Sequence, residues 1–230
     1  MLASRYIPWV VLAAAAGPLV VLWAVGPLRT ASTTSAAGSE PGQPAARGPD
    51  HAREKHYVSP RQLADSNGMV QRQAGDFSAM TQDGRRMDWG DLSGGRPVVL
   101  IFIKEGCPCS VEVEPFFQRV EMLYAGEVRF SGVIDAGTEA AARYAIDQGV
   151  AHPILADPER RLIRRFRAKN GCYVVLLTPG GVIDGFWPGC SADTMRQLGR
   201  RIAGLAGVGE RPLDVSGMPV SLTTGCPFKS

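Results

Sequence analysis

The residues of this chain best suited to chemistry are two cysteines separated by a proline, Cys107-Pro108-Cys109. They follow an apolar run from Pro97 to Ile103 and precede a segment with helical periodicity, so they should lie between a strand and a helix. Backbone N–H groups at the start of a helix stabilise a thiolate. Pro108 suits the first helical position, which leaves Cys107 as the preceding residue and the predicted nucleophile. The pair indicates a redox-active site, and the alternative is two inert buried thiols.

Three further cysteines, Cys172, Cys190 and Cys226, bring the total to five. Five is too few for a scaffold built on disulfides in a chain of 230 residues, and an odd number leaves at least one thiol unpaired. Cys190 and Cys226 could pair and fix the C-terminal tail, but nothing in the sequence sets that connectivity.

The apolar pattern around the cysteine pair predicts a βαβ unit. The β-branched run from Pro97 to Ile103 is typical of a strand buried on both faces and should be the central strand. Apolar residues at helical spacing from Ser110 to Tyr124 predict a helix, and Val128 to Ile134 predicts a second strand. A second amphipathic helix is expected from Thr138 to Gln148, with Thr138 as its N-cap.

Further elements extend this unit along the chain. They are a hairpin around Asp83-Gly84 between residues 76 and 92, a short helix capped by Asp157 and reaching Phe166, two strands at Tyr173–Leu177 and Val182–Phe186, and a helix from Ser191 to about Leu205. The order predicts an α/β fold with a mixed central sheet and helices on both faces. Such an order leaves the function open.

The N-terminus differs from the rest of the chain. No charged residue occurs from Ile7 to Leu28, and 22 helical residues at ~1.5 Å each span the ~30 Å hydrocarbon core of a bilayer. Arg5 and Arg29 bracket this stretch. It predicts one transmembrane helix that anchors the protein, and the alternative is a cleaved secretory signal, whose apolar core is usually shorter. Either interpretation places the folded part outside the cytoplasm, in the periplasm or an equivalent compartment.

Composition limits the remaining possibilities. Residues from Thr30 to about His56 are dominated by Ala, Ser, Thr, Gly and Pro without apolar periodicity, which indicates a flexible linker. The 25 Lys and Arg residues are nearly balanced by 22 Asp and Glu residues, so the charge gives no reason to expect a nucleic acid partner.

The motifs resemble one known family. The segments Val99–Pro115, Asp157-Pro158, Val174–Leu177, Gly180-Gly181-Val182-Ile183 and Gly189 are similar to the redoxin branch of the thioredoxin superfamily, over roughly Asp76 to Leu205. Within that branch the chain resembles both the membrane-tethered TlpA/ResA-type thiol-disulfide oxidoreductases and the alkyl hydroperoxide reductase/thiol-specific antioxidant family. Pro115, eight residues after Cys107, corresponds to the helix-kinking proline of thioredoxins. The resemblance implies a thioredoxin-like fold and a redox-active disulfide without a cofactor.

Two departures from the family pattern concern the thiols. The second cysteine of a Cys-x-x-Cys site falls on Ser110, and the second thiol comes one position earlier, at Cys109. A bridge between residues two apart cannot form within regular helix and would be strained, which tends to make it oxidising. Cys172 falls where the family places a cis-proline beside the site. It could resolve Cys107 or Cys109, or it could fill a small buried space.

Several functions remain open at this stage. The first is thiol-disulfide exchange with protein thiols and disulfides, served by an upstream thiol reductant or oxidant. The second is peroxide reduction through a sulfenic acid, although Leu100 and Lys104 stand where peroxiredoxins carry Pro and Thr. A third is a copper-handling or redox-inert binding module, since soft Cu(I) suits the thiolates of Cys107, Cys109 and Cys172.

The predicted organisation of the chain follows from these assignments. It comprises a transmembrane anchor or signal at residues 1–29, a flexible linker at 30–56, a lead-in segment at 57–75, a thioredoxin-like domain at 76–206 and an irregular C-terminal tail at 207–230.

Overall fold

The computed structural model describes residues 56–229. The predicted membrane helix at Ile7–Leu28 and nearly all of the predicted linker lie outside the described residues. Within residues 56–229, no helix is long and apolar enough to cross a bilayer.

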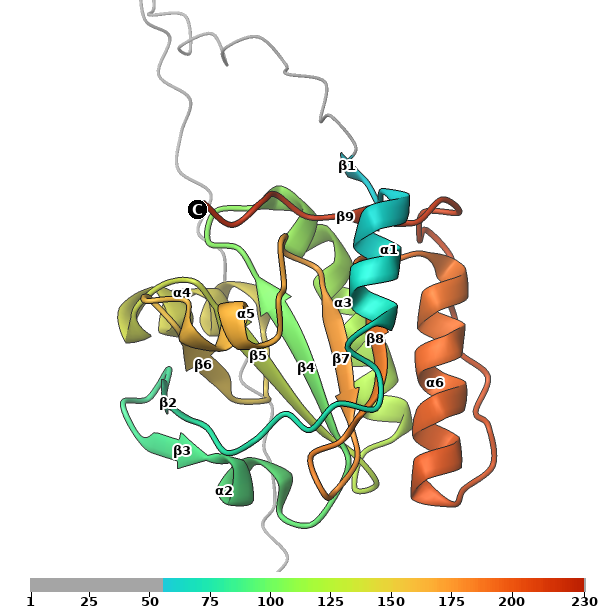
Figure 1. Ribbon diagram of the computed structural model, residues 1–230, viewed down its shortest axis with the longest axis horizontal. Helices are drawn as coiled ribbons and strands as arrows, with labels where there is room; N and C mark the ends of the chain where they lie inside the picture. Colours follow the sequence, from blue (N-terminus) through green and yellow to red (C-terminus); the bar gives the residue numbers. More distant parts are fainter. Residues whose placement is uncertain (1–55, 230) are drawn as a thin grey trace, which may run out of the picture. The chain divides into compact units, whose positions relative to one another are not determined.

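A seven-stranded mixed sheet forms the centre of the fold (Figure 1). Its order is β3-β2-β6-β5-β4-β7-β8, with bounds β2 Ser78–Thr81, β3 Arg86–Asp88, β4 Val98–Ile103, β5 Arg129–Ile134, β6 Ile154–Ala156, β7 Val174–Leu177 and β8 Ile183–Trp187. Strand β5 is parallel to β4 and β6, and the other pairs are antiparallel. All six residues of β4 are buried, as the apolar run predicted.

Helices cover both faces of the sheet, as predicted. The helices are α1 Pro60–Asn67, α2 Trp89–Ser93, α3 Pro108–Leu123, α4 Thr138–Gln148, α5 Arg161–Arg165 and α6 Ala192–Ala206. Alternate side chains of β4 enter two separate apolar clusters because successive residues of a strand point to opposite faces. Val99, Ile101 and Ile103 pack with apolar residues of α3, α4 and α6. Residues of α2 and α5 pack in the cluster on the other face.

Two helix starts differ from the prediction. Thr138 is the first residue of α4 and not its cap, because Gly137 occupies the capping position without a side-chain hydrogen bond. Helix α5 begins at Arg161, later than predicted, because Arg160 adopts a left-handed conformation with φ 55°. The Asp157 carboxylate nevertheless accepts hydrogen bonds from the backbone N–H groups of Arg161 and Ile163, at 2.7 and 2.9 Å. The Asp157 side chain therefore pairs N–H groups in the first turn of α5, although it is not the residue next to the helix.

The C-terminal segment forms a separate two-stranded sheet with the first described strand. Most of the segment after Gly207 has neither helix nor strand, but β9, Thr223–Thr224, pairs with β1, His56–Tyr57, in an antiparallel ladder. We refer to residues 223–228 as the C-terminal strap. Figure 1 shows this strap crossing the molecule at the end where β4 stops and α3 begins. Residues distant in sequence thereby reach the site that follows β4.

The packing of α3 against the sheet can be tested by truncating one apolar side chain. Phe117 is fully buried, so Phe117→Ala should lower the free energy of unfolding by about 3–5 kcal/mol through lost burial and a residual cavity. Met122 lies on the same helix with 71% of its surface exposed, and Met122→Ala should change stability by less than about 0.5 kcal/mol. Urea denaturation of both variants measures this difference. Equal losses would show that α3 does not pack as described.

Candidate functional site

Cys107 lies between the end of β4 and the start of α3. It is the N-cap residue of α3, with extended backbone at φ −82° and ψ 116°, and Pro108 follows at the first helical position. The backbone N–H of Cys107 donates to the carbonyl of Lys104 at 3.1 Å, which closes the connecting turn. Only 3% of Cys107 is exposed. The predicted nucleophile is therefore placed at a helix N-terminus and covered by other parts of the chain.

The turn before Cys107 is fixed by an acidic side chain from the neighbouring strand. Asp135, directly after β5, accepts from the backbone N–H of Glu105 at 2.7 Å and pairs with the ammonium of Lys104 at 2.9 Å. The Lys104 charge is therefore engaged by a carboxylate that also holds the turn. The two interactions position the loop that presents Cys107.

The environment of Cys107 favours its thiolate. Burial by itself would raise the pKa of the thiol, but hydrogen bonds from the side chain and backbone of Cys226, together with the backbone amides of Ser110 and Cys109, hold the pKa below its ordinary value. The backbone N–H of Cys226 donates to Cys107 Sγ at 3.1 Å. Donors thus come from the start of α3 and from the C-terminal strap.

Cys226 has the opposite tendency. Burial, the hydrogen bond to Cys107 and the charges of Cys107 and Cys109 raise its pKa to about 12. Of the two neighbouring thiols, Cys107 therefore loses its proton at a lower pH than Cys226 does. In this pair the Cys226 thiol donates a hydrogen bond to the Cys107 thiolate.

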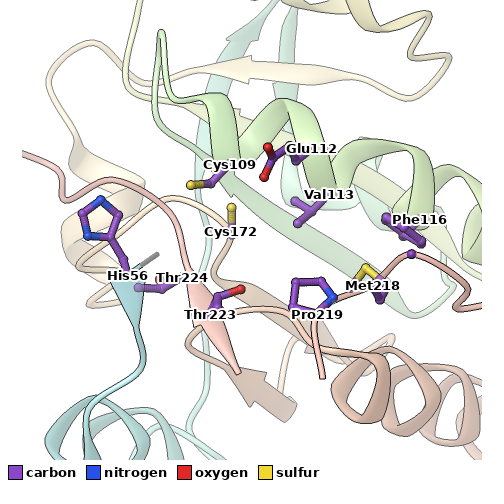
Figure 2. A pocket seen from close by; sticks show the side chains of 11 residues that line it. His56, Cys109, Glu112, Val113, Phe116, Cys172, Met218, Pro219, Thr223 and Thr224 are labelled. Carbon is purple, nitrogen blue, oxygen red and sulfur yellow. The ribbon is translucent and has the colours of Figure 1, made fainter. Parts of the chain in front are cut away.

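Cys109 faces a pocket next to this pair. It is the second residue of α3, is partly exposed, and lines a cavity of about 510 Å³ together with Cys172, Phe116, Met218 and Thr223. Figure 2 shows Cys109 and Cys172 on one wall, and Pro219 and Thr223 of the C-terminal segment across from them. The pocket is therefore bounded partly by α3 and partly by the end of the chain.

Cys172 lies two residues before β7, the strand that pairs antiparallel with β4. Its backbone is left-handed, with φ 63°, and no peptide bond in residues 56–229 is cis. The N–H of Cys172 donates to the Phe102 carbonyl at 2.7 Å, and its Sγ lies 3.9 Å from the Ser110 hydroxyl. Burial, followed by the charges of Cys190 and Cys107, raises its pKa well above the ordinary value. Cys172 is thus beside the site as predicted, but as a buried neutral thiol.

The two remaining cysteines are not placed as a pair. All five cysteines are free thiols. Cys190 is 1% exposed, and its thiol donates to the carbonyl of Cys172 at 3.6 Å, whereas Cys226 lies against Cys107. The suggested Cys190–Cys226 pairing is therefore not the arrangement in the structure. Sequence reasoning missed Cys226 as a site residue, and the only available signal was the odd cysteine count.

A buried carboxyl lies one turn further along α3. Glu114 is 1% exposed, and its Oε2 accepts a hydrogen bond from the Tyr144 hydroxyl at 3.0 Å. The same hydroxyl lies 3.3 Å from the Ser110 carbonyl, while Glu114 Oε1 is buried with no partner. Burial raises the pKa of Glu114 despite the opposing effects of His152 and Tyr144. Pro115 follows inside the helix, as the motif predicted.

The described part of the chain, residues 56–229, contains no group of three or more His, Cys, Asp or Glu residues arranged to hold a metal ion. Cys107, Cys109 and Cys172 do lie near one another, since the charges of Cys107 and Cys109 act on Cys172, and Cys109 and Cys172 line the same pocket. Their arrangement is that of a thiolate, a pocket-lining thiol and a buried neutral thiol.

Comparison with known proteins shows the fold and a family match over part of the chain. Residues 70–183 match the AhpC/TSA family. A search of curated proteins gave no match. A putative protein disulfide isomerase from Bacteroides thetaiotaomicron is similar at 19% identity, covering 67% of this chain and 95% of that chain with a TM-score of 0.55.

Two other solved structures are similar to a comparable extent. Peroxidoxin BcpB from Mycobacterium tuberculosis matches at 16% identity over 61% of this chain and 98% of that chain, with a TM-score of 0.52. A putative thiol:disulfide interchange protein DsbE from Chlorobium tepidum matches at 20% identity over 60% and 98%, with a TM-score of 0.54. These similarities show a thioredoxin-like α/β fold.

The electrostatics of Cys107 predict a pH profile for its reactivity. Alkylation by iodoacetamide should follow thiolate formation, with a midpoint below the ordinary value of 9.0, because amide and thiol donors stabilise the charge. Cys226→Ala removes the thiol donor but keeps the amide, so the midpoint should rise. Cys190→Ala, which removes no donor to Cys107, should leave it unchanged. Peptide mass analysis of alkylated Cys107 against pH measures this, and a midpoint insensitive to Cys226→Ala would contradict the assignment.

Glu114 predicts a separate effect of pH on stability. Its pKa is raised in the folded protein, whereas in the unfolded chain it titrates near 4.5, so above that pH the folded state binds more protons. The free energy of unfolding should therefore fall as pH rises through the interval between the two pKa values. Glu114→Gln keeps an oxygen for Tyr144 without a charge and should lose less stability over that interval. Urea denaturation at several pH values measures the slope, and identical slopes would be evidence against a raised pKa.

Proposed function

We propose, from the AhpC/TSA match over residues 70–183 and the thioredoxin-like fold, that this chain is an oxidoreductase that exchanges thiols and disulfides with protein substrates through Cys107. The family match supports an oxidoreductase, and the surroundings of Cys107 support this residue as the nucleophile. The observation that carries the proposal is the thiolate-stabilising environment of Cys107 at the start of α3. A thiolate is the attacking species in thiol-disulfide exchange.

The reaction begins with attack of the Cys107 thiolate on one sulfur of a substrate disulfide. A bond forms between Cys107 Sγ and that sulfur, the substrate S–S bond breaks, and the other substrate sulfur leaves as a thiolate that takes up a proton. A neighbouring thiol of the enzyme then attacks Cys107 Sγ and releases the second substrate thiol. Cys109 and Cys172 are the candidates from the sequence. The oxidised enzyme is returned to its dithiol form by an upstream thiol reductant, and the reverse direction would require an oxidant.

The pocket beside Cys109 supports a polypeptide substrate. Its apolar lining includes Val113, Phe116 and Met218, while Glu112 adds a charged side chain. A cavity of about 510 Å³ has room for a side chain that flanks the reacting cysteine of a substrate. The pocket therefore offers contacts beyond the disulfide itself.

The N-terminal sequence also supports a cellular location for the redox domain. The uncharged stretch from Ile7 to Leu28 supports a single membrane anchor, and the composition of residues 30–56 supports a flexible tether. We propose that the redox domain works outside the cytoplasm, where substrate disulfides form and persist.

Thiol peroxidase activity is the second candidate. The AhpC/TSA match favours it, and a thiol with 3% exposure is more readily reached by a small peroxide than by a protein disulfide. In that reaction the Cys107 thiolate would take one peroxide oxygen, becoming sulfenic acid as the peroxide is reduced to an alcohol or water. Against it, Leu100 and Lys104 replace the Pro and Thr of the peroxiredoxin motif.

An assay with two substrates separates these candidates. With insulin and dithiothreitol, the full chain should accelerate insulin reduction, and Cys107→Ser should reduce the rate to background because it removes the nucleophile. Cys190→Ala is the matched control, since Cys190 is a buried thiol whose side chain contacts Cys172 rather than Cys107, and it should retain activity. Rapid peroxide consumption dependent on Cys107, with no insulin reduction, would instead establish the peroxidase.

A further inference from the structure

We propose that Cys226, carried on the C-terminal strap, is the thiol that resolves the mixed disulfide on Cys107. This inference rests on the proposed exchange function and assigns a residue that the motif did not indicate. The backbone N–H of Cys226 donates to Cys107 Sγ at 3.1 Å, although the two residues are 119 positions apart. Cys226 therefore reaches that sulfur from outside α3 through both its backbone and its side chain.

The strap is held in place by backbone interactions on both sides of Cys226. Gly225 N–H donates to the Gly171 carbonyl at 2.8 Å, and Gly171 N–H donates to the Cys226 carbonyl at 2.9 Å. Further along, Phe228 N–H donates to the Lys169 carbonyl at 2.9 Å. The strap therefore lies along the loop before β7, and this pairing sets the position of Cys226 relative to Cys107.

Glycines permit this close approach. A Cβ on Gly225 would lie 2.8 Å from the carbonyl carbon of Gly171, and a Cβ on Gly189 would lie 2.2 Å from the Thr223 carbonyl oxygen. Neither position tolerates a side chain without movement of backbone. Side chains add to the contact, since Thr224 Oγ1 donates to the Gly171 carbonyl at 3.2 Å and Asn170 Nδ2 donates to the Gly225 carbonyl at 2.8 Å.

The two thiols predicted from the sequence are less suited to this step. Cys109 belongs to the first turn of α3, and a disulfide to Cys107, only two residues away, would close a tight ring that requires this turn to unwind. Cys172 is 2% exposed and close to the Ser110 hydroxyl, and burial opposes its ionisation. Cys226 is outside the helix and partly exposed.

The ionisation of the two thiols determines which of them attacks first. While Cys107 is a thiolate, its charge and hydrogen bond keep Cys226 protonated. Once Cys107 forms a disulfide with the substrate, that charge is gone and Cys226 ionises more easily. Cys226 then attacks Cys107 Sγ, the Cys107–substrate bond breaks, and the released substrate thiolate takes the proton that Cys226 lost. The products are a Cys107–Cys226 disulfide and a reduced substrate, and an external dithiol restores the enzyme.

The position of the strap also accounts for the burial of Cys107. Since 3% of Cys107 is exposed, a protein disulfide reaches its sulfur only when the strap moves aside. Return of the strap brings Cys226 back to Cys107 and so coincides with resolution. Opening breaks a few backbone hydrogen bonds at the end of the chain rather than the core.

The test uses the reduced full chain and one equivalent of 5,5′-dithiobis(2-nitrobenzoate). Attack by Cys107 releases one thionitrobenzoate, and resolution releases a second, so absorbance follows both steps. The wild type and the control Cys190→Ala should release two and yield a Cys107–Cys226 bridge in peptide mass maps. Cys226→Ser should release only the first and retain a thionitrobenzoate adduct on Cys107.

Gly225→Ala provides an independent variant that keeps every thiol. Its Cβ should displace the strap from Gly171, so the second release should slow while the first persists. Gly209→Ala is the matched control, because a Cβ there meets nothing within 4 Å, and it should behave as wild type.

The outcomes distinguish this inference from the proposed function. A second release in Cys226→Ser, with a bridge from Cys107 to Cys109 or Cys172, would overturn the role of Cys226 and leave thiol-disulfide exchange intact. If no release in any variant depends on Cys107, as judged by Cys107→Ser, both the exchange function and this inference are wrong.

Discussion

The arrangement of the site depends on how the charge of one buried sulfur is stabilised. Cys107 is removed from water, which disfavours its thiolate, and donors must compensate for the lost hydration. The start of α3 supplies some of them and the C-terminal strap supplies the others. Because the two sources are far apart in the sequence, the reactivity of the thiol requires the tertiary fold as well as a local motif.

That requirement explains features that would otherwise be unrelated. Gly189 and Gly225 allow two backbones to pack with no side chain between them, while a Cβ on Gly171 would lie 3.1 Å from the Ser110 hydroxyl and 3.2 Å from Lys104. Cys172 adopts a left-handed conformation next to Gly171, in the loop that both pairs with the strap and leads into β7. Its N–H donates to Phe102 in β4, so the loop under the strap is tied to the strand that presents Cys107. The sheet thus holds both thiols at one end.

The sequence predicted the elements whose signals are local. The apolar run of β4, the helical spacing of α3 and the turn residues between β7 and β8 each identify an element without reference to the rest of the chain. Strand β6 has three residues and escaped prediction, since so short a run has no distinct periodicity. Helix α1 lies in a segment regarded only as a lead-in, although Ser59 and Gln62 form a capping box there.

The same distinction applies to the site, where local sequence indicated one thiol but not the thiol that a long-range contact brings beside it. Cys107 could be identified because a cysteine, a proline and a following helix are adjacent in sequence. Cys226 could not, because its position is set by pairing of the strap with residues 169–171, and such a long-range contact leaves no periodic pattern. The tail after Gly207 has no periodic apolar pattern, which concealed that its last residues are fixed by backbone hydrogen bonds.

The position of the resolving thiol also changes the redox chemistry expected of the site. A bridge between Cys107 and Cys109 would strain the first turn of α3, and strained disulfides tend to be oxidising. A bridge to Cys226 would close a loop across 119 positions through a strap that already lies beside the sulfur. The entropy of closing that loop acts on the unfolded chain, so the reduction potential of the folded site depends on the strain of the bridge and on the stability of the thiolate. Each 1.4 kcal/mol that stabilises the reduced form raises the potential by about 30 mV. The donors to Cys107 therefore favour the dithiol form, and an unstrained bridge to Cys226 would make the site less oxidising than a strained bridge to Cys109.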